Sequence, residues 1–224
     1  MQHYAPHLNA TFEGYYSRFM LPSGASLALI VCSVPKAAQK PHMLSFTYVP
    51  SGSSNIFQRE LWVESIERIP ATGSNNAFRL LIPGIGYVAC SADSTMEYSL
   101  DSAEFSLHAT TKTRTPWSKH QKSPEGWLAH LPLPLHWHVH SVASECEFSL
   151  SIPSIAGLPE ADTQGMAVVH QEKNWAQSFP DAHIWVQARK GFRGFCCAGG
   201  SILGMEAFLL PCNLGMVPIH VSKN

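Results

Sequence analysis

The sequence predicts an all-β fold, a barrel or sandwich of antiparallel strands. Short runs rich in β-branched and aromatic residues recur along the chain, each bounded by Gly, Pro, Asn or Ser. Sixteen prolines and fifteen glycines leave no window in which an amphipathic helix of about 12 residues would be stable. Many short strands at near-regular spacing are typical of sandwiches and barrels.

The predicted strands follow one another through the whole chain. In one of them Leu61 and Val63 alternate with Trp62 and Glu64, a period that favours a half-buried strand over a helix. In the first half we expect strands at residues 25–32, 42–49, 57–66, 77–82, 86–92, 96–100 and 104–110. In the second half we expect them at residues 136–142, 147–152, 166–175 and 183–189.

The organisation that we predict is two β units. Residues 111–134 are rich in Pro, Lys and Trp, which indicates a long connection or a lid over one cavity. Residues 1–110 would form the first unit and residues 135–224 the second, with this second unit incomplete. The chain shows no internal repeat, heptad pattern or low-complexity tract.

The composition favours a hydrophobic site and argues against charged partners. Apolar residues make up 45 % of the chain and charged residues only 14 %, well below the typical quarter, so we expect an apolar, aromatic-lined interior that holds a hydrophobic small molecule. A net charge of −1 without a basic run argues against nucleic-acid binding. The longest apolar run, residues 25–32, is too short to span a bilayer, and we expect at most weak membrane association.

The beginning of the chain and the cysteine pattern predict a cytoplasmic protein. Residues 1–7 have neither the positive segment nor the apolar segment of a secretory signal. The six cysteines include no C-x-x-C pair, and we expect them to be reduced and mostly buried.

Three passages, in the same order along the chain, resemble the tocopherol cyclase-like family. Residues 12–16, Phe-Glu-Gly-Tyr-Tyr, are similar to the family's F-E-G-W-Y opening. Residues 172–180, Glu-Lys-Asn-Trp-Ala-Gln-Ser-Phe-Pro, and residues 183–187, His-Ile-Trp-Val-Gln, are similar to E-K-[DN]-W-G-x-x-F-P followed by W-x-W-x-Q. The departures are Ala176 in place of Gly and His183 in place of Trp, and family members continue with several more strands.

The resemblance implies a lipocalin-like pair of β units around a hydrophobic pocket and the closure of a prenylated phenol or quinol into a chroman ring. Such a reaction requires an acid that protonates the alkene, aromatic faces that stabilise the tertiary cation, and exclusion of water. It requires no cofactor. A close variant is pericyclic closure of a polyene, in which no proton moves.

Two carboxyl groups are candidate acids. On a strand, Glu172 shares a face with Val168, His170 and Asn174, so the proton donor or phenol orienter would be Glu172, assisted by His138 or His170. The alternative for Glu172 is an ion pair with Lys173 or with an arginine that fixes the turn before residues 178–180. Glu13 lies in an aromatic run, and its alternative is a structural bond to Arg18 or to backbone amides.

Aromatic and polar residues near these carboxyl groups are the candidate substrate contacts. Aromatic rings stabilise a cation through the negative face of the ring, although such residues are often part of a core. The candidates are Tyr16, Trp137, Trp175, Trp185, His136, His140, Asn174 and Gln187.

His136, His138 and His140 form a further constellation. Alternate residues of a strand point the same way, about 6.6 Å apart from i to i+2, so two of these histidines would share a zinc ion only with help from another strand, such as His170 or Glu172. Otherwise they would line a polar wall of the pocket or relay protons.

Three hypotheses therefore follow from the sequence. The first is a cofactor-free cyclase without a metal site, the second is a lipocalin-type carrier that returns its ligand unchanged, and the third is a metalloprotein built on the histidine strand.

Overall fold

The computed structural model describes residues 4–52, 54–71, 77–117, 124–126, 130, 135–177, 182–190, 193–202, 205–209 and 212–214. The predicted all-β fold is confirmed, because the elements within these described ranges are strands apart from a three-residue 3-10 helix, Glu160–Asp162. Among the described residues, no helix is long and apolar enough to cross a bilayer.

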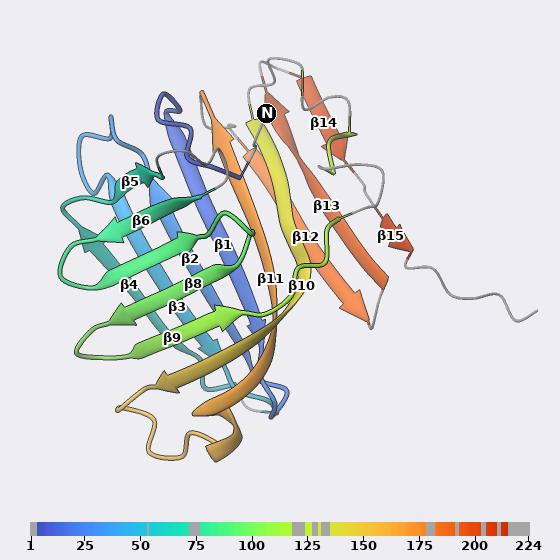
Figure 1. The fold of residues 1–224 in the computed structure, drawn as a ribbon. Coiled ribbons are helices and arrows are strands. Elements are labelled where there is room, and N and C mark those ends of the chain that lie inside the picture. The colour runs from blue at the N-terminus through green and yellow to red at the C-terminus, as the bar shows by residue number, and fades with distance from the viewer. Residues whose placement is uncertain are drawn as a thin grey trace, which may run out of the picture.

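Eleven antiparallel strands form one large sheet that curls upon itself (Figure 1). Its strands are β1 (Phe12–Met20), β2 (Ser26–Ser33), β3 (His42–Val49), β4 (Phe57–Val63), β5 (Glu67–Pro70), β6 (Phe78–Ile82), β7 (Gly86–Cys90), β8 (Met96–Asp101), β9 (Ser106–Thr111), β10 (Leu135–Ser151) and β11 (Gln164–Ala176).

The strand order follows the chain around the sheet. Neighbouring strands run β4-β3-β2-β1-β11-β10-β9-β8-β7-β6-β5, so that β11 returns to pair with β1. The two edge strands, β4 and β5, are consecutive in the sequence and are separated by only three residues. The large sheet is therefore an up-and-down barrel whose unpaired seam lies between β4 and β5.

A second sheet contains β12 (Ala182–Lys190), β13 (Arg193–Ile202), β14 (Met205–Leu209) and β15 (Cys212–Leu214), with β13 pairing all three others. The hydrogen-bonded ladders divide the chain elsewhere than at residue 135, where the sequence analysis begins its second unit. Both β10 and β11 belong to the large sheet, because β10 pairs with β9 and β11 pairs with β1. Within the expected connection, Thr115 lies beside β10 through a bond from the Val142 N–H to the Thr115 carbonyl.

Most predicted strands are confirmed to within a few residues. The range 42–49 agrees at both ends, and the separate ranges 136–142 and 147–152 join into the 17-residue β10. The sequence analysis did not assign a strand to residues 12–20, which form β1. Residues 193–202 form the strand β13, to which the sequence analysis also assigned no strand.

The interior of the large barrel is filled by its own side chains. The alternation seen in β2, where every second residue is buried, places Leu27, Leu29 and Val31 in one continuous core cluster. Rings fill the centre, and Phe46 and Phe105 are stacked at 3.9 Å between ring centroids. The prediction of a ligand-holding interior is therefore wrong for the described part of this barrel, because aromatic side chains from facing strands occupy that space.

One end of the barrel is closed around a buried carboxylate. Asp162, in the 3-10 helix, accepts hydrogen bonds from the Ser23 hydroxyl (2.6 Å), the Ser23 amide (3.2 Å) and the Tyr48 hydroxyl (2.8 Å). These bonds attach the segment before β11 to the β1–β2 turn and to β3.

A filled interior predicts that Phe105→Ala is strongly destabilising. Removing a ring that is 1 % exposed and stacked on Phe46 should lower the free energy of unfolding by about 3–5 kcal/mol, measured by urea denaturation. Met166→Ala, at a side chain that is 52 % exposed, is the matched control and should unfold like the wild type. A loss below about 1 kcal/mol for Phe105→Ala would contradict a packed core.

Candidate functional site

Strand β11 carries polar residues that are buried on both of its faces. Residues with odd numbers, such as Val169 in the core cluster, face the barrel interior, and Lys173 and Trp175 share that face. Residues with even numbers face away from the interior. Val168, His170, Glu172 and Asn174 share this face, as we predicted, but the face lies outside the barrel and not in the interior where we expected Glu172. The two faces therefore form two separate polar sites.

His170 and Glu172 form a buried pair on the outer face. The His170 Nε2 atom lies 2.9 Å from the Glu172 Oε2 atom, and their side chains are only 9 % and 1 % exposed. Positions i and i+2 of a strand lie about 6.6 Å apart, a span that the two side chains close by leaning together. The predicted partnership of Glu172 with His170 is thus present in the structure.

The surroundings of this pair are largely apolar. Tyr16 of β1 and Val139 of β10 lie directly across from Glu172 in the two adjacent ladders. Trp137 lies across from Asn174 and packs with Val139 and Trp117 in a small apolar cluster. Glu172 is therefore placed among the rings and aliphatic groups that a proton donor for a hydrocarbon requires.

Two irregularities of β10 fall beside His170. The register between β10 and β11 shifts between Val139 and Ser141 and again between Ser141 and Ser144. These bulges flank Gln171 and leave His170 without a direct partner in the β10 ladder. Bulges of this kind redirect side chains and are over-represented next to active sites.

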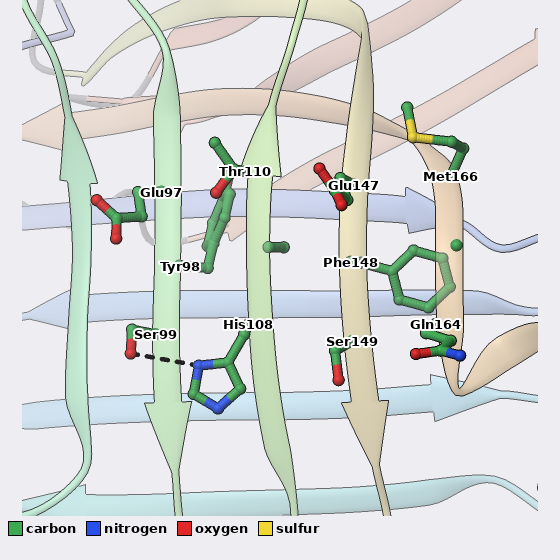
Figure 2. Close-up of a pocket in the computed structure, with 12 residues that line it drawn as sticks. Glu97, Tyr98, Ser99, His108, Thr110, Glu147, Phe148, Ser149, Gln164 and Met166 are labelled. Atoms are coloured by element: carbon green, nitrogen blue, oxygen red, sulfur yellow. Dashed lines mark hydrogen bonds between the residues drawn. The ribbon is translucent and has the colours of Figure 1, made fainter.

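Elsewhere on the same sheet, the outer face carries polar and charged side chains that are exposed to solvent. An open groove of about 700 Å³ lies over β8 to β11. Figure 2 shows that Glu97, Ser99, His108 and Glu147 point outward from the strands there. Ser99 and His108 are joined there at 3.4 Å. Glu147 is 65 % exposed and pairs with Lys112 at 2.8 Å. The apolar face around Glu172 is therefore a local feature.

The second polar site, on the inner face, joins Glu13 to Lys173. The Lys173 Nζ atom lies 2.7 Å from the Glu13 Oε1 atom, and these side chains are 0 % and 1 % exposed. Lys173 also donates to the Ala5 carbonyl and lies 2.6 Å from the His7 Nδ1 atom, so its three donors are all engaged. Glu13 receives further bonds from the His7 amide (2.7 Å) and from Arg68 Nη1 (3.3 Å).

This inner site is a structural closure of the barrel mouth. Burial alone raises the pKa of Glu13, but the hydrogen bond from His7 and the charge of Lys173 outweigh it and lower that pKa to about 2. Burial lowers the pKa of Lys173 to about 8, against the opposing attraction of Glu13. Arg68 also binds the carbonyls of His7 and Leu8. The role of Glu13 as a structural anchor fits these contacts, with Lys173, Arg68 and His7 as partners instead of Arg18.

The three alternate histidines of β10 point to the inner face, on the opposite side of the sheet from Glu172. His136 stacks on Trp175 at 5.0 Å, and His140 stacks on Tyr4 at 4.2 Å. His138 lies across from Lys173 in the ladder. The predicted assistance of Glu172 by His138 is therefore wrong, because His138 lies on the inner face of the sheet and Glu172 lies on the outer face.

The other bonds of these histidines also differ from the metal-site hypothesis. His136 Nδ1 lies 3.2 Å from Glu125, and His140 Nε2 lies 3.1 Å from the Ser94 carbonyl. Burial lowers the pKa of His140 to about 4, so this imidazole is neutral at pH 7. Within the ranges that the structure describes, no three His, Cys, Asp or Glu residues are grouped to hold a metal ion.

The remaining predicted contacts divide between the two faces. Tyr16, Trp137 and Asn174 share the face of Glu172, whereas Trp175 lies on the inner face, stacked between His7 and His136. The side chains of Trp185 and Gln187 lie outside the described residues. Cys32, Cys90 and Cys146 are free thiols.

The sequence analysis missed the partners of Glu13. Lys173 was considered only as a partner of Glu172, and that alternative is wrong, because strand alternation places Glu172 outward and Lys173 inward, where it pairs with Glu13. His7 and Arg68 lie far from Lys173 in the sequence, and no local pattern connects them.

No family model and no curated protein sequence matches the chain. Several solved structures do match it in fold. CghA in complex with Sch210972 superposes with a TM-score of 0.67 at 10 % identity, over 91 % of this chain and 58 % of CghA. The fold is lipocalin-like.

Two further structures share this architecture. A putative AttH from Nitrosomonas europaea matches with a TM-score of 0.59 at 10 % identity, over 94 % of this chain and 71 % of that one. Kievitone hydratase from Nectria haematococca matches with a TM-score of 0.59 at 8 % identity, over 95 % and 64 %. The chain thus spans less than two thirds of CghA and of kievitone hydratase.

The inner ion pair predicts a large effect of Glu13→Gln on stability. Lys173 and Arg68 would keep their charges without a counter-charge, so the free energy of unfolding at pH 7 should fall by about 3–5 kcal/mol in urea denaturation. The folded pKa of Glu13 is about 2 against an ordinary value of 4.5, so its stabilisation is complete above pH 4.5 and is lost as the pH falls toward 2. The difference between variant and wild type should therefore shrink over that interval.

Glu147→Gln is the control for this measurement, because it removes an exposed carboxylate that also pairs with a lysine. If both variants lost equal stability at pH 7, Glu13 would not be the anchor of the barrel mouth.

Proposed function

We propose that the chain belongs to an enzyme that transfers a proton to an alkene of a hydrophobic small molecule and thereby closes a ring. The His170–Glu172 pair, buried on an apolar outer face of the sheet, is the observation that carries this proposal. The substrate that fits is a prenylated phenol or quinol, as the resemblance of residues 12–16 and 172–187 to tocopherol cyclase-like proteins implies.

The geometry supports a site outside the filled barrel. A substrate over the outer face of β1, β11 and β10 would contact Tyr16 and Trp137, with Glu172 between these strands. Aromatic rings stabilise a neighbouring cation by about 0.5–2 kcal/mol each, most strongly when water is excluded. The burial of Glu172 to 1 % exposure shows that bulk water does not reach the carboxyl group.

The proposed step is balanced without a cofactor. The pair gives one proton to the less substituted carbon of the alkene, and the π electrons form the new C–H bond. The tertiary cation that results is captured by the phenol oxygen, which forms the ring C–O bond and loses its proton to the pair. Glu172 and His170 end as they began.

The alternative is a carrier of the same fold that releases its ligand unchanged. Another catalytic alternative is pericyclic closure, in which the site only holds the substrate in a folded conformation and no proton is transferred. Capture of the cation by water would give hydration instead of a ring, and kievitone hydratase shows that this fold occurs in a protein named as a hydratase.

The proposal predicts that Glu172→Gln abolishes turnover. Wild-type protein incubated with geranylhydroquinone should give a product of unchanged mass and altered chromatographic retention, and the variant should lower the rate by at least about 100-fold because the proton is lost from the pair. Glu147→Gln, which alters an exposed carboxyl group, is the matched control and should turn over normally.

Three results would count against a proton-transfer cyclase. Full activity of Glu172→Gln would indicate pericyclic closure, and recovery of the unchanged quinol from a tight wild-type complex would indicate a carrier. A product heavier by one water would indicate a hydratase.

A further inference from the structure

Arg18 differs from the other arginines whose side chains the structure describes, because it has only one weak and neutral partner. Its Nη2 atom donates to the Ser26 hydroxyl at 3.3 Å. Within the described residues, no carboxylate lies at ion-pair distance from Arg18. The others are engaged by carboxylates (Arg59 with Glu104, Arg68 with Glu13), by a carbonyl (Arg114 with His140) or by a ring (Arg79 with Tyr87 at 4.4 Å).

The place of Arg18 in the sheet puts it beside the proposed proton donor. β1 alternates so that Ser17 and Phe19 face the core and Arg18 faces outward. In the antiparallel ladder Arg18 lies directly across from His170, a relation that brings Cβ atoms to about 4.5–5.5 Å. Arg18 therefore shares one face and one row of the sheet with the histidine of the buried pair.

Among the described residues, those directly beside Arg18 on this face carry no negative charge. Tyr16 and Met20 are its neighbours along the strand on this face, and Ala28 is its partner on β2. The carboxylate of Glu172 lies one row away but is engaged with His170 at 2.9 Å. A half-buried guanidinium with five donors is stabilised when it binds an oxyanion, and most of the donors of Arg18 remain available for one.

We propose that Arg18 binds a carboxylate at one end of a lipophilic substrate. The anion would lie between the guanidinium and His170, and the apolar body would extend over Tyr16 toward Val139 and Trp137. This inference rests on the proposed function, whose substrate class it narrows to prenylated phenols or quinols that also carry a carboxylate. Arg18 is a binding residue that fixes where the substrate lies relative to Glu172.

The test compares a lipophilic acid with its neutral ester on the same protein. Fluorescence titration with cis-parinaric acid and with its methyl ester should show that the wild-type chain prefers the acid by about tenfold or more, the size of one charge-assisted interaction. Arg18→Gln should remove this preference by weakening binding of the acid alone, and Arg18→Lys should restore part of it. Arg59→Gln, which alters an exposed arginine of the edge strand β4, should keep it.

The failure of this inference is distinguishable from failure of the proposed function. Glu172→Gln should retain the preference for the acid whether or not proton transfer occurs. Equal binding of acid and ester by the wild type, no binding of either, or an unchanged preference in Arg18→Gln would overturn the role of Arg18. A thermal unfolding curve of each variant should show that the protein is folded at the temperature of the titration.

Discussion

Two adjacent residues of β11, the acidic Glu172 and the basic Lys173, are both buried, yet the alternation of a strand points them to opposite faces. They cannot neutralise each other, so each requires a partner on its own side. Burying a charge without a partner costs several kcal/mol, which makes these partnerships a condition for the sheet to close. Lys173 meets Glu13 inside the barrel mouth, and Glu172 meets His170 outside.

The inner partnership explains how the barrel is completed. Glu13 is on β1 and Lys173 on β11, the two strands whose pairing returns the chain to its start. The same lysine holds Ala5 and His7, so the N-terminal segment closes that end while Asp162 closes the other. Both ends are closed and aromatic rings fill the centre, which is why the proposed site is placed on the outer face, where Tyr16, Val139 and Trp137 adjoin Glu172.

The sequence predicted most of the fold because local signals determine strands. Turn residues bounded residues 42–49 correctly, and the strand alternation of residues 168–174 placed His170 with Glu172. It could not predict which strands pair, since β11 returns to β1 across more than 140 residues and no local pattern encodes that ladder. His138 could not be excluded as a partner of Glu172 either, because the register of β10 against β11 determines which face His138 occupies. Arg18 was considered only as a partner of Glu13, since its position opposite His170 exists only in the ladder.

The central claim is that Glu172 and His170 deliver a proton to carbon, and isotopic labelling tests it most directly. When geranylhydroquinone is incubated with the wild-type chain in D₂O, the cyclised product should carry one deuterium at the alkene carbon that receives the proton, detected as a carbon–deuterium signal by NMR. Cyclised product without deuterium at carbon would contradict proton transfer, and unchanged quinol would contradict catalysis.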